Sequence, residues 1–236
     1  MPELLVEQRF NGPPGSGNGG YVCGLVAGLL GGGPAEVTLR APPPLERAMQ
    51  VQVQGDEAVV RDGDTVVAQG VRAEVEVDPG APVTPAEAAQ AAAAGLSDWS
   101  GGHPFPSCFV CGPERGQGDG MRIFPGALGD SRYAADWTPH ESLADESGTV
   151  RPECVWAALD CPTSAPGANW GEGPAVVLGR LAASLEGHVQ AGEPHALVSW
   201  RTAHEGRKRE AACVLLDAGG AVLARSRAVW IELREG

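Results

Sequence analysis

The chain contains two unlike versions of one arrangement, in which a single apolar helix precedes a set of alternating strands. In the first half, an apolar run over residues 19–30 precedes strands whose last hairpin turns at Asp62-Gly63. In the second half, an apolar run over residues 152–160 precedes strands whose last hairpin turns at residues 217–220. An internal repeat determines the overall architecture of a chain, so we consider it before the individual helices and strands. We therefore predict two related modules of α+β class, each with one helix against an antiparallel meander.

A segment rich in Pro, Gly and Asp at residues 78–85 separates the two halves. We place the N-terminal module at residues 1–80, a linker at residues 81–100 and the C-terminal module at residues 101–236. Runs of alternating apolar and polar residues are typical of half-buried strands. In the second module they predict strands at residues 121–124, 132–137, 176–185, 196–203, 210–216 and 221–233.

The linker carries a strong helix-start signal. Thr84 suits the N-cap, Pro85 the first helical position, and Glu87 the reciprocal position of a capping box. The alanine-rich run that follows predicts a short helix ending near Gly95, either packed across the linker or acting as a spacer.

Composition limits the partners and the location of the chain. A formal net charge of −13 argues against nucleic-acid binding, which needs a basic face. No apolar run approaches the ~18 residues of a membrane span, and the N-terminus lacks the basic start and apolar core of a signal peptide. We expect a cytoplasmic protein without a membrane or nucleic-acid partner. Assembly as a homodimer is compatible with this composition.

Six cysteines in a chain of this length do not resemble a disulfide scaffold. The spacing of Cys108 and Cys111, with His103 nearby, matches one half of a zinc-knuckle site. A second close pair of ligands is missing from the sequence, although residues distant in the chain could contribute in space, namely Cys154, Cys161 or His140. We favour a structural turn without metal over a zinc site or a redox pair.

Two local motifs resemble those of a known family. Cys-Phe-Val-Cys-Gly-Pro at residues 108–113, followed by Gly-Met-Arg-Ile-Phe at residues 120–124, resembles the opening of many PaaI-like thioesterases. Asn18-Gly19-Gly20, at the head of an apolar helix, is similar to their His-Gly-Gly motif. With its two meanders, the chain resembles the hotdog-fold thioesterase superfamily, and in particular double-hotdog acyl-CoA thioesterases. The resemblance implies a double hotdog, in which two antiparallel sheets each wrap around a central helix with pseudo-two-fold symmetry.

The resemblance also implies where the chemistry lies. In the family, a carboxylate lies about two helical turns after the second Gly of the motif, a position that is Ala27 in the first half. In the second half, Asp160 lies seven residues after Glu153, which stands at the second-Gly position. In many hotdog dimers the helix N-terminus of one subunit faces the acid of the other. We therefore expect the Gly19-Gly20 helix start to face Asp160 across the two modules.

These residues suit the hydrolysis of a thioester. The backbone N–H of Gly19 or Gly20 would stabilise negative charge on the carbonyl oxygen, because a helix N-terminus presents unpaired donors. The side-chain amide of Asn18 or Asn11 would orient the carbonyl, although Asn18 could equally be only an N-cap. Asp160 would activate water or attack the carbonyl directly.

Further residues are candidates for substrate contact. Ser164 matches a hydroxyl that assists the carboxylate in some relatives, or it belongs to a structural turn. Arg201 and Arg207 lie on a basic hairpin that could meet the phosphates of coenzyme A, although such a tip is usually only solvated. Aromatic and polar residues near the two motifs complete the expected substrate-binding set: Tyr21, Trp156, Thr163 and Trp170.

The sequence thus predicts a hydrolase whose partner is a small-molecule acyl thioester, an acyl-CoA or a related compound, and whose mechanism requires no cofactor. One alternative is a non-catalytic acyl-thioester-binding protein. Another is a hotdog dehydratase or hydratase, which typically needs a catalytic His that neither helix start carries. A structural or interaction module is the last alternative.

Overall fold

The computed structural model describes residues 2–167 and 174–233, and its strands form one sheet. The helices are α1 (Gly19–Leu29), α2 (Pro85–Ser100) and α3 (Pro152–Asp160), with short 3₁₀ helices η1 (Gln8–Phe10), η2 (Glu141–Leu143) and η3 (Cys161–Gly167). The first half supplies the strands β1 (Glu3–Leu4), β2 (Ala35–Leu39), β3 (Met49–Gln54), β4 (Glu57–Asp62) and β5 (Thr65–Arg72). The second half supplies β6 (Gly126–Ala127), β7 (Arg132–Trp137), β8 (Val176–Leu185), β9 (His195–Glu205), β10 (Lys208–Leu216) and β11 (Val222–Glu232).

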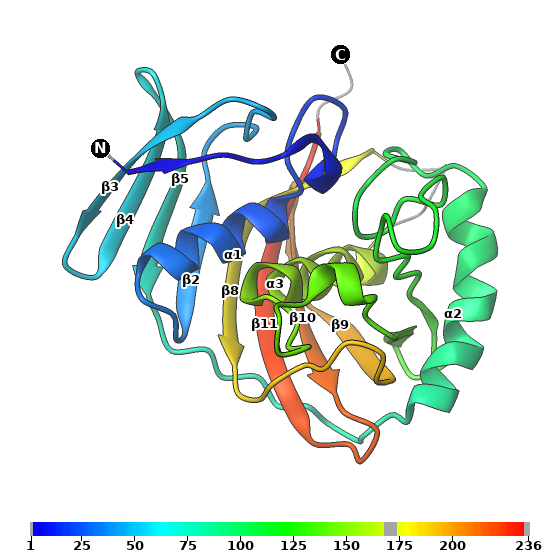
Figure 1. The fold of residues 1–236 in the computed structure, drawn as a ribbon. Coiled ribbons are helices and arrows are strands. Elements are labelled where there is room, and N and C mark those ends of the chain that lie inside the picture. The colour runs from blue at the N-terminus through cyan, green and yellow to red at the C-terminus, as the bar shows by residue number, and fades with distance from the viewer. Residues whose placement is uncertain (1, 168–173, 234–236) are drawn as a thin grey trace.

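The strand order confirms the repeated layout and corrects the expectation of two sheets. The order is β1-β3-β4-β5-β2-β8-β11-β10-β9-β7-β6, so each half runs outward from a central strand that directly follows its helix in the chain (Figure 1). The central strands β2 and β8 pair antiparallel, with Glu36 opposite Ala182. An unpaired strand edge leaves backbone donors and acceptors without partners. Pairing β2 with β8 removes two such edges, and a single sheet results.

Helices α1 and α3 pack against each other on one face of this sheet (Figure 1). Two glycines of α1 allow the close approach. A Cβ on Gly24 would lie 2.5 Å from the Cα of Glu153, and a Cβ on Gly20 would lie 2.4 Å from the Cβ of Asp160. Because Gly20 is near the start of α1 and Asp160 ends α3, the two helices run antiparallel.

The linker helix α2 begins as predicted and ends later. The backbone N–H of Glu87 donates to Thr84 Oγ1 at 3.2 Å, and the N–H of Thr84 donates to Glu87 Oε2 at 2.8 Å, which is a capping box. The helix continues beyond Gly95 to Ser100 and packs on β6 and β7. Its last turn is fixed by Trp99, whose buried indole donates to Pro125 O at 2.9 Å. Tertiary packing therefore extends a helix whose sequence signal ends at Gly95.

The expectation of a strand at residues 121–124 was wrong. Met121 N–H donates to Phe109 O at 2.8 Å, and Ile123 N–H donates to Val110 O at 3.0 Å. Arg122 between them has a φ of 57°, in the left-handed region. This segment therefore bonds to the Cys108–Cys111 turn instead of the sheet, and the partner of β7 is the shorter β6.

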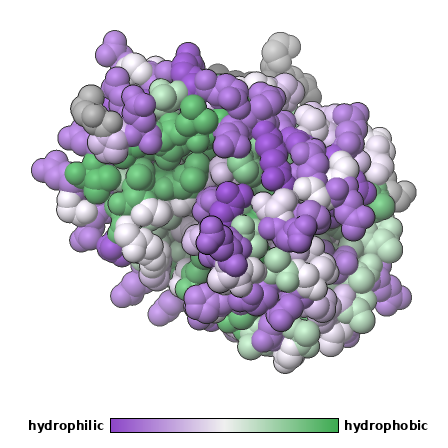
Figure 2. Space-filling view, in the orientation of Figure 1, coloured by the Kyte–Doolittle hydropathy of each residue, from purple (hydrophilic) through white to green (hydrophobic). Residues whose placement is uncertain are grey.

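Figure 2 shows hydrophobic residues gathered over the part of this face where α1 lies. Leu25 and Leu29 of α1 are only partly buried against the core. Within the described residues, every helix is too short or too polar to span a bilayer.

Candidate functional site

The N-terminus of α1 meets the carboxylate that ends α3, as the resemblance to the hotdog family implies. Asp160 is 1% exposed, and its Oδ2 accepts hydrogen bonds from the Gly20 N–H at 2.8 Å and from Asn18 Nδ2 at 3.3 Å. The positive end of the α1 dipole further stabilises the negative charge at this position. Oδ1 of Asp160 has no hydrogen-bond partner among the described residues. One carboxylate oxygen is thus held by two hydrogen bonds, and the other is buried without one in the described part of the chain.

Burial and, to a lesser degree, the charge of Cys108 raise the pKa of Asp160 to about 7, against the opposing hydrogen bonds from Gly20 and Asn18. Transfer from water disfavours the charged form of a carboxyl group, whereas hydrogen bonds to the carboxylate favour it. Asp160 therefore differs from an ordinary surface aspartate in its readiness to accept a proton near neutral pH.

Asn18 serves both as a helix cap and as a carboxylate donor. Its Oδ1 accepts from the Tyr21 N–H at 2.9 Å, which is the geometry of an N-cap, while its Nδ2 points to Asp160. Gly19 is the first helical residue, so its N–H has no acceptor within α1. The N–H of Gly20 is already bonded to Asp160, which corrects the expectation that it could stabilise an oxyanion. Gly19 is the donor that remains.

A cavity of about 450 Å³ opens beside this constellation. Asn18, Gly19 and Asp160 line it together with Ser164, whose hydroxyl donates to Cys161 O at 2.8 Å. Much of its wall is apolar, and several lining residues were not predicted from the sequence, among them Leu39, Phe105, Val176, Leu178 and Trp230. They come from separate strands and loops, so no local pattern in the sequence links them.

Two residues expected to contact substrate do not line the cavity. The side-chain amide of Asn11 donates to Gly12 O and to Ser107 Oγ, each at 3.2 Å, so it cannot orient a substrate carbonyl in the cavity. Tyr21 is buried and stacks on Phe10, with ring centroids 4.0 Å apart. Both expectations were wrong, because the side chains are used within the protein.

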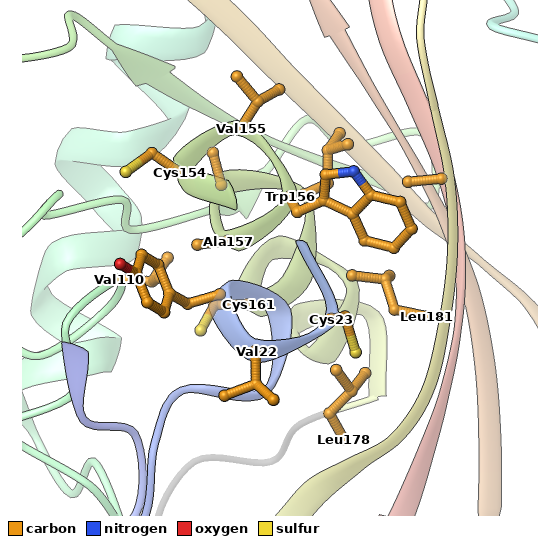
Figure 3. Close-up of a cluster of buried hydrophobic side chains, with 14 of the residues drawn as sticks. Val22, Cys23, Val110, Cys154, Val155, Trp156, Ala157, Cys161, Leu178 and Leu181 are labelled. Atoms are coloured by element: carbon orange, nitrogen blue, oxygen red, sulfur yellow. The ribbon is translucent and has the colours of Figure 1, made fainter. Parts of the chain in front are cut away.

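The expectations for Trp156 and Thr163 are corrected in the same way. Trp156 is buried, and Figure 3 shows its indole between α3 and the strands of the sheet. Thr163 Oγ1 donates to the carbonyl of Asp160 and accepts from Trp230 Nε1 at 2.7 Å. It therefore supports Trp230, the tryptophan that does line the cavity. Trp170 lies outside the described residues.

The two arginines proposed to bind coenzyme A do not line the cavity either. Arg201 donates to Pro166 O at 3.0 Å through Nε, and Arg207 donates to Glu232 O at 3.0 Å through Nη1. Each guanidinium donates to a backbone carbonyl within the protein, and contact of these two residues with the phosphates of coenzyme A stays a prediction.

The predicted Cys108–Cys111 turn and His103 also line the cavity, and the fold brings Cys161 to them. Hydrogen bonds from Cys111 and Cys161 hold the pKa of Cys108 well below its usual range. Burial raises the pKa of Cys111, and the hydrogen bond with Cys108 raises that of Cys161. Cys108, Cys111, Cys161 and His103 therefore form one buried polar cluster at the wall of the cavity.

Comparison with known proteins gives the fold. No protein-family model and no curated protein sequence matches the chain. Among solved structures, the tesB protein of Mycobacterium avium subspecies paratuberculosis is similar over 92% of this chain and 88% of its own, with a TM-score of 0.60 and 12% identity. A protein of Lactobacillus plantarum assigned as an oleoyl thioesterase is similar over 99% and 96%, with a TM-score of 0.59 and 10% identity. A protein of Thermobifida fusca assigned as a thioesterase II is similar over 98% and 92%, with a TM-score of 0.58 and 14% identity. The chain therefore has the hotdog fold of these thioesterases.

Proposed function

We propose that the chain hydrolyses an acyl thioester, an acyl-CoA or a related compound, in the cavity beside Asp160. One observation carries this proposal: a buried carboxylate has one oxygen fixed by a helix N-terminus and the other unbonded, at the wall of an apolar cavity. The similarity of nearly the whole chain to two solved structures assigned as thioesterases supports the same reaction.

In the proposed reaction, Asp160 Oδ1 takes a proton from a water molecule as the water oxygen attacks the thioester carbonyl carbon. The electron pair of the carbonyl moves to its oxygen, where the N–H of Gly19 and the dipole of α1 stabilise the charge. Collapse of this intermediate breaks the carbon–sulfur bond, and the proton held by Asp160 passes to the departing thiolate. A carboxylic acid and a thiol result, and Asp160 is again ionised.

Asn18 keeps the carboxylate in the orientation that this step needs. Its bond to Oδ2, with that of Gly20, leaves Oδ1 without a hydrogen bond among the described residues, and we assign the proton transfer to this oxygen. Direct attack by Oδ1 on the carbonyl, to give an acyl anhydride, uses the same geometry. After a single turnover in H₂¹⁸O, solvent oxygen in Asp160 identifies the anhydride route, because attack of water on the enzyme carbonyl of the anhydride leaves the water oxygen in Asp160.

The walls of the cavity suit an acyl group. Leu178 and Val176 of β8, with Trp230 of β11, present apolar surface, and the volume of about 450 Å³ lies in the usual range of small-molecule sites. We propose that the acyl chain lies against these residues, with the thioester carbonyl at Gly19 and Asp160.

Thiol release from a panel of short, long and aromatic acyl-CoAs tests the proposal. Saturable turnover of at least one class supports hydrolysis and identifies the acyl group. Binding of acyl-CoA without any turnover would overturn it in favour of a non-catalytic acyl-thioester-binding protein. The absence of both binding and turnover would exclude acyl-CoA as the ligand and overturn the proposal for this substrate class.

A further inference from the structure

Three of the six cysteines meet at one place, although they come from distant parts of the chain. The Sγ atoms of Cys108, Cys111 and Cys161 all lie within 4.8 Å of one another, and those of Cys108 and Cys161 are 3.9 Å apart. All three side chains are buried, yet they line the cavity. Such an arrangement is unlike Cys23 and Cys213, which are single thiols within the core.

The backbone from Cys108 to Gly112 forms a tight turn. The Gly112 N–H donates to Cys108 O at 2.9 Å and closes the turn. A Cβ at Gly112 would lie 2.5 Å from both the N and the O of Cys108, so only glycine fits. Cys-x-x-Cys turns of this kind present two sulfurs to one metal ion in zinc sites.

Polar donors point at the sulfurs, which simple core packing does not require. His103 Nδ1 accepts from the Phe105 N–H at 2.9 Å, so in the neutral ring the proton is on Nε2. This Nε2 lies 3.2 Å from Cys111 Sγ. The Asn18 amide lies 3.8 Å from Cys108 Sγ and 3.9 Å from Cys161 Sγ. Hydrogen bonds to sulfur favour thiolates, which are the form that binds metal.

We propose that Cys108, Cys111 and Cys161 bind one Zn²⁺ ion through their thiolates, with the fourth coordination position open to the cavity. With Zn–S bonds of ~2.3 Å, tetrahedral geometry separates the sulfurs by about 3.8 Å. The separation of 3.9 Å between Cys108 and Cys161 needs almost no change. Three soft thiolates select zinc or another soft ion over Mg²⁺ or Ca²⁺.

His103 is a positioning residue in this proposal. Its protonated Nε2 donates to the Cys111 thiolate, and the backbone of Phe105 holds the ring in that tautomer. Partners of this kind orient the ligand and typically change metal affinity by about 10–100-fold when removed.

The first test is the metal content of the native chain, purified without chelators and without a metal-binding tag and measured by plasma mass spectrometry. We expect one zinc per chain. Cys108→Ser, Cys111→Ser and Cys161→Ser should each lose stoichiometric zinc, whereas Cys213→Ala, which removes a buried thiol from β10, should keep it. His103→Gln should retain one site of lower affinity, and complete loss of zinc would show instead that His103 is a ligand.

A second measurement needs no variant and so does not depend on their folding. The reduced, zinc-free wild type is titrated with Co²⁺, and a saturable thiolate-to-cobalt charge-transfer band with tetrahedral visible bands is expected at one equivalent. Wild type without zinc and without this band, or with a native disulfide between Cys108 and Cys161, would overturn the proposal. The inference does not depend on hydrolysis, because metal content and cobalt spectra are measured without substrate.

Discussion

Replacement of Gly20 by Ala tests the helix contact that builds the site. The new Cβ would lie 2.4 Å from Asp160 Cβ and 2.9 Å from Trp156 O, where carbon contacts are normally about 3.5–4.0 Å. The backbone of α3 cannot move away without losing its own packing contacts. The overpacking should therefore lower the free energy of unfolding by about 1–3 kcal/mol. Separation of the helices also weakens the hydrogen bond from the Gly20 N–H to the Asp160 carboxylate. Hydrogen bonds to charged groups contribute about 1.5–3 kcal/mol to stability. The higher helix propensity of Ala offsets at most about 1 kcal/mol of this loss of stability.

The net expectation for Gly20→Ala is a loss of about 2–5 kcal/mol in the free energy of unfolding. In a chain of this size that corresponds to about 4–20 °C in Tm, measured by calorimetry or circular dichroism. Gly28→Ala in the same helix is the matched control, because a Cβ there has no heavy atom within 4 Å. This variant should be more stable than wild type by about 0.5–1 kcal/mol. Equal stability of Gly20→Ala and wild type would refute the close α1–α3 contact.

Three further predictions follow from single side chains. Asn18→Ser keeps the N-cap but loses the donor to Asp160, so the free energy of unfolding should fall by about 1.5–3 kcal/mol and kcat/KM about tenfold or more; unchanged turnover would remove Asn18 from the site. Ser164→Ala should leave kcat/KM within about threefold, since its hydroxyl is bonded to Cys161 O, and a hundredfold loss would show that it acts on substrate. Burial lowers the pKa of His195 below its usual 6.5, so below that pH the unfolded chain binds a proton that the folded chain does not. Stability should therefore fall with decreasing pH by up to about 1.4 kcal/mol per unit from this group, and denaturant titrations should show a smaller fall in His195→Gln.

Local patterns predicted those parts of the molecule that depend on short segments. The capping box at Thr84 and the helix that ends at Asp160 follow from a few neighbouring residues, and both are present. The meeting of Gly20 and Asp160 was expected from the resemblance to hotdog dimers, which implies that the helix N-terminus of one module faces the acid of the other.

The remaining features depend on tertiary structure that no local pattern encodes. Trp230 reaches the cavity because of the register of β11, whereas Trp156, closer to Asp160 in sequence, points into the core. The Gly20 N–H could be assigned to the carboxylate only once the separation of the helices was known. Cys161 joins Cys108 and Cys111, although it lies 53 positions after Cys108, because α3 ends beside their turn.

The most direct test of the central claim is thiol release by wild type and by Asp160→Asn on the same acyl-CoA panel. Asp136→Asn, a change at an exposed carboxylate of β7, is the matched control. Our account predicts turnover by wild type and Asp136→Asn, and a loss of about 10²-fold or more in kcat for Asp160→Asn with acyl-CoA binding retained. Turnover by Asp160→Asn at the wild-type rate would contradict the assignment of this carboxylate as the catalytic group.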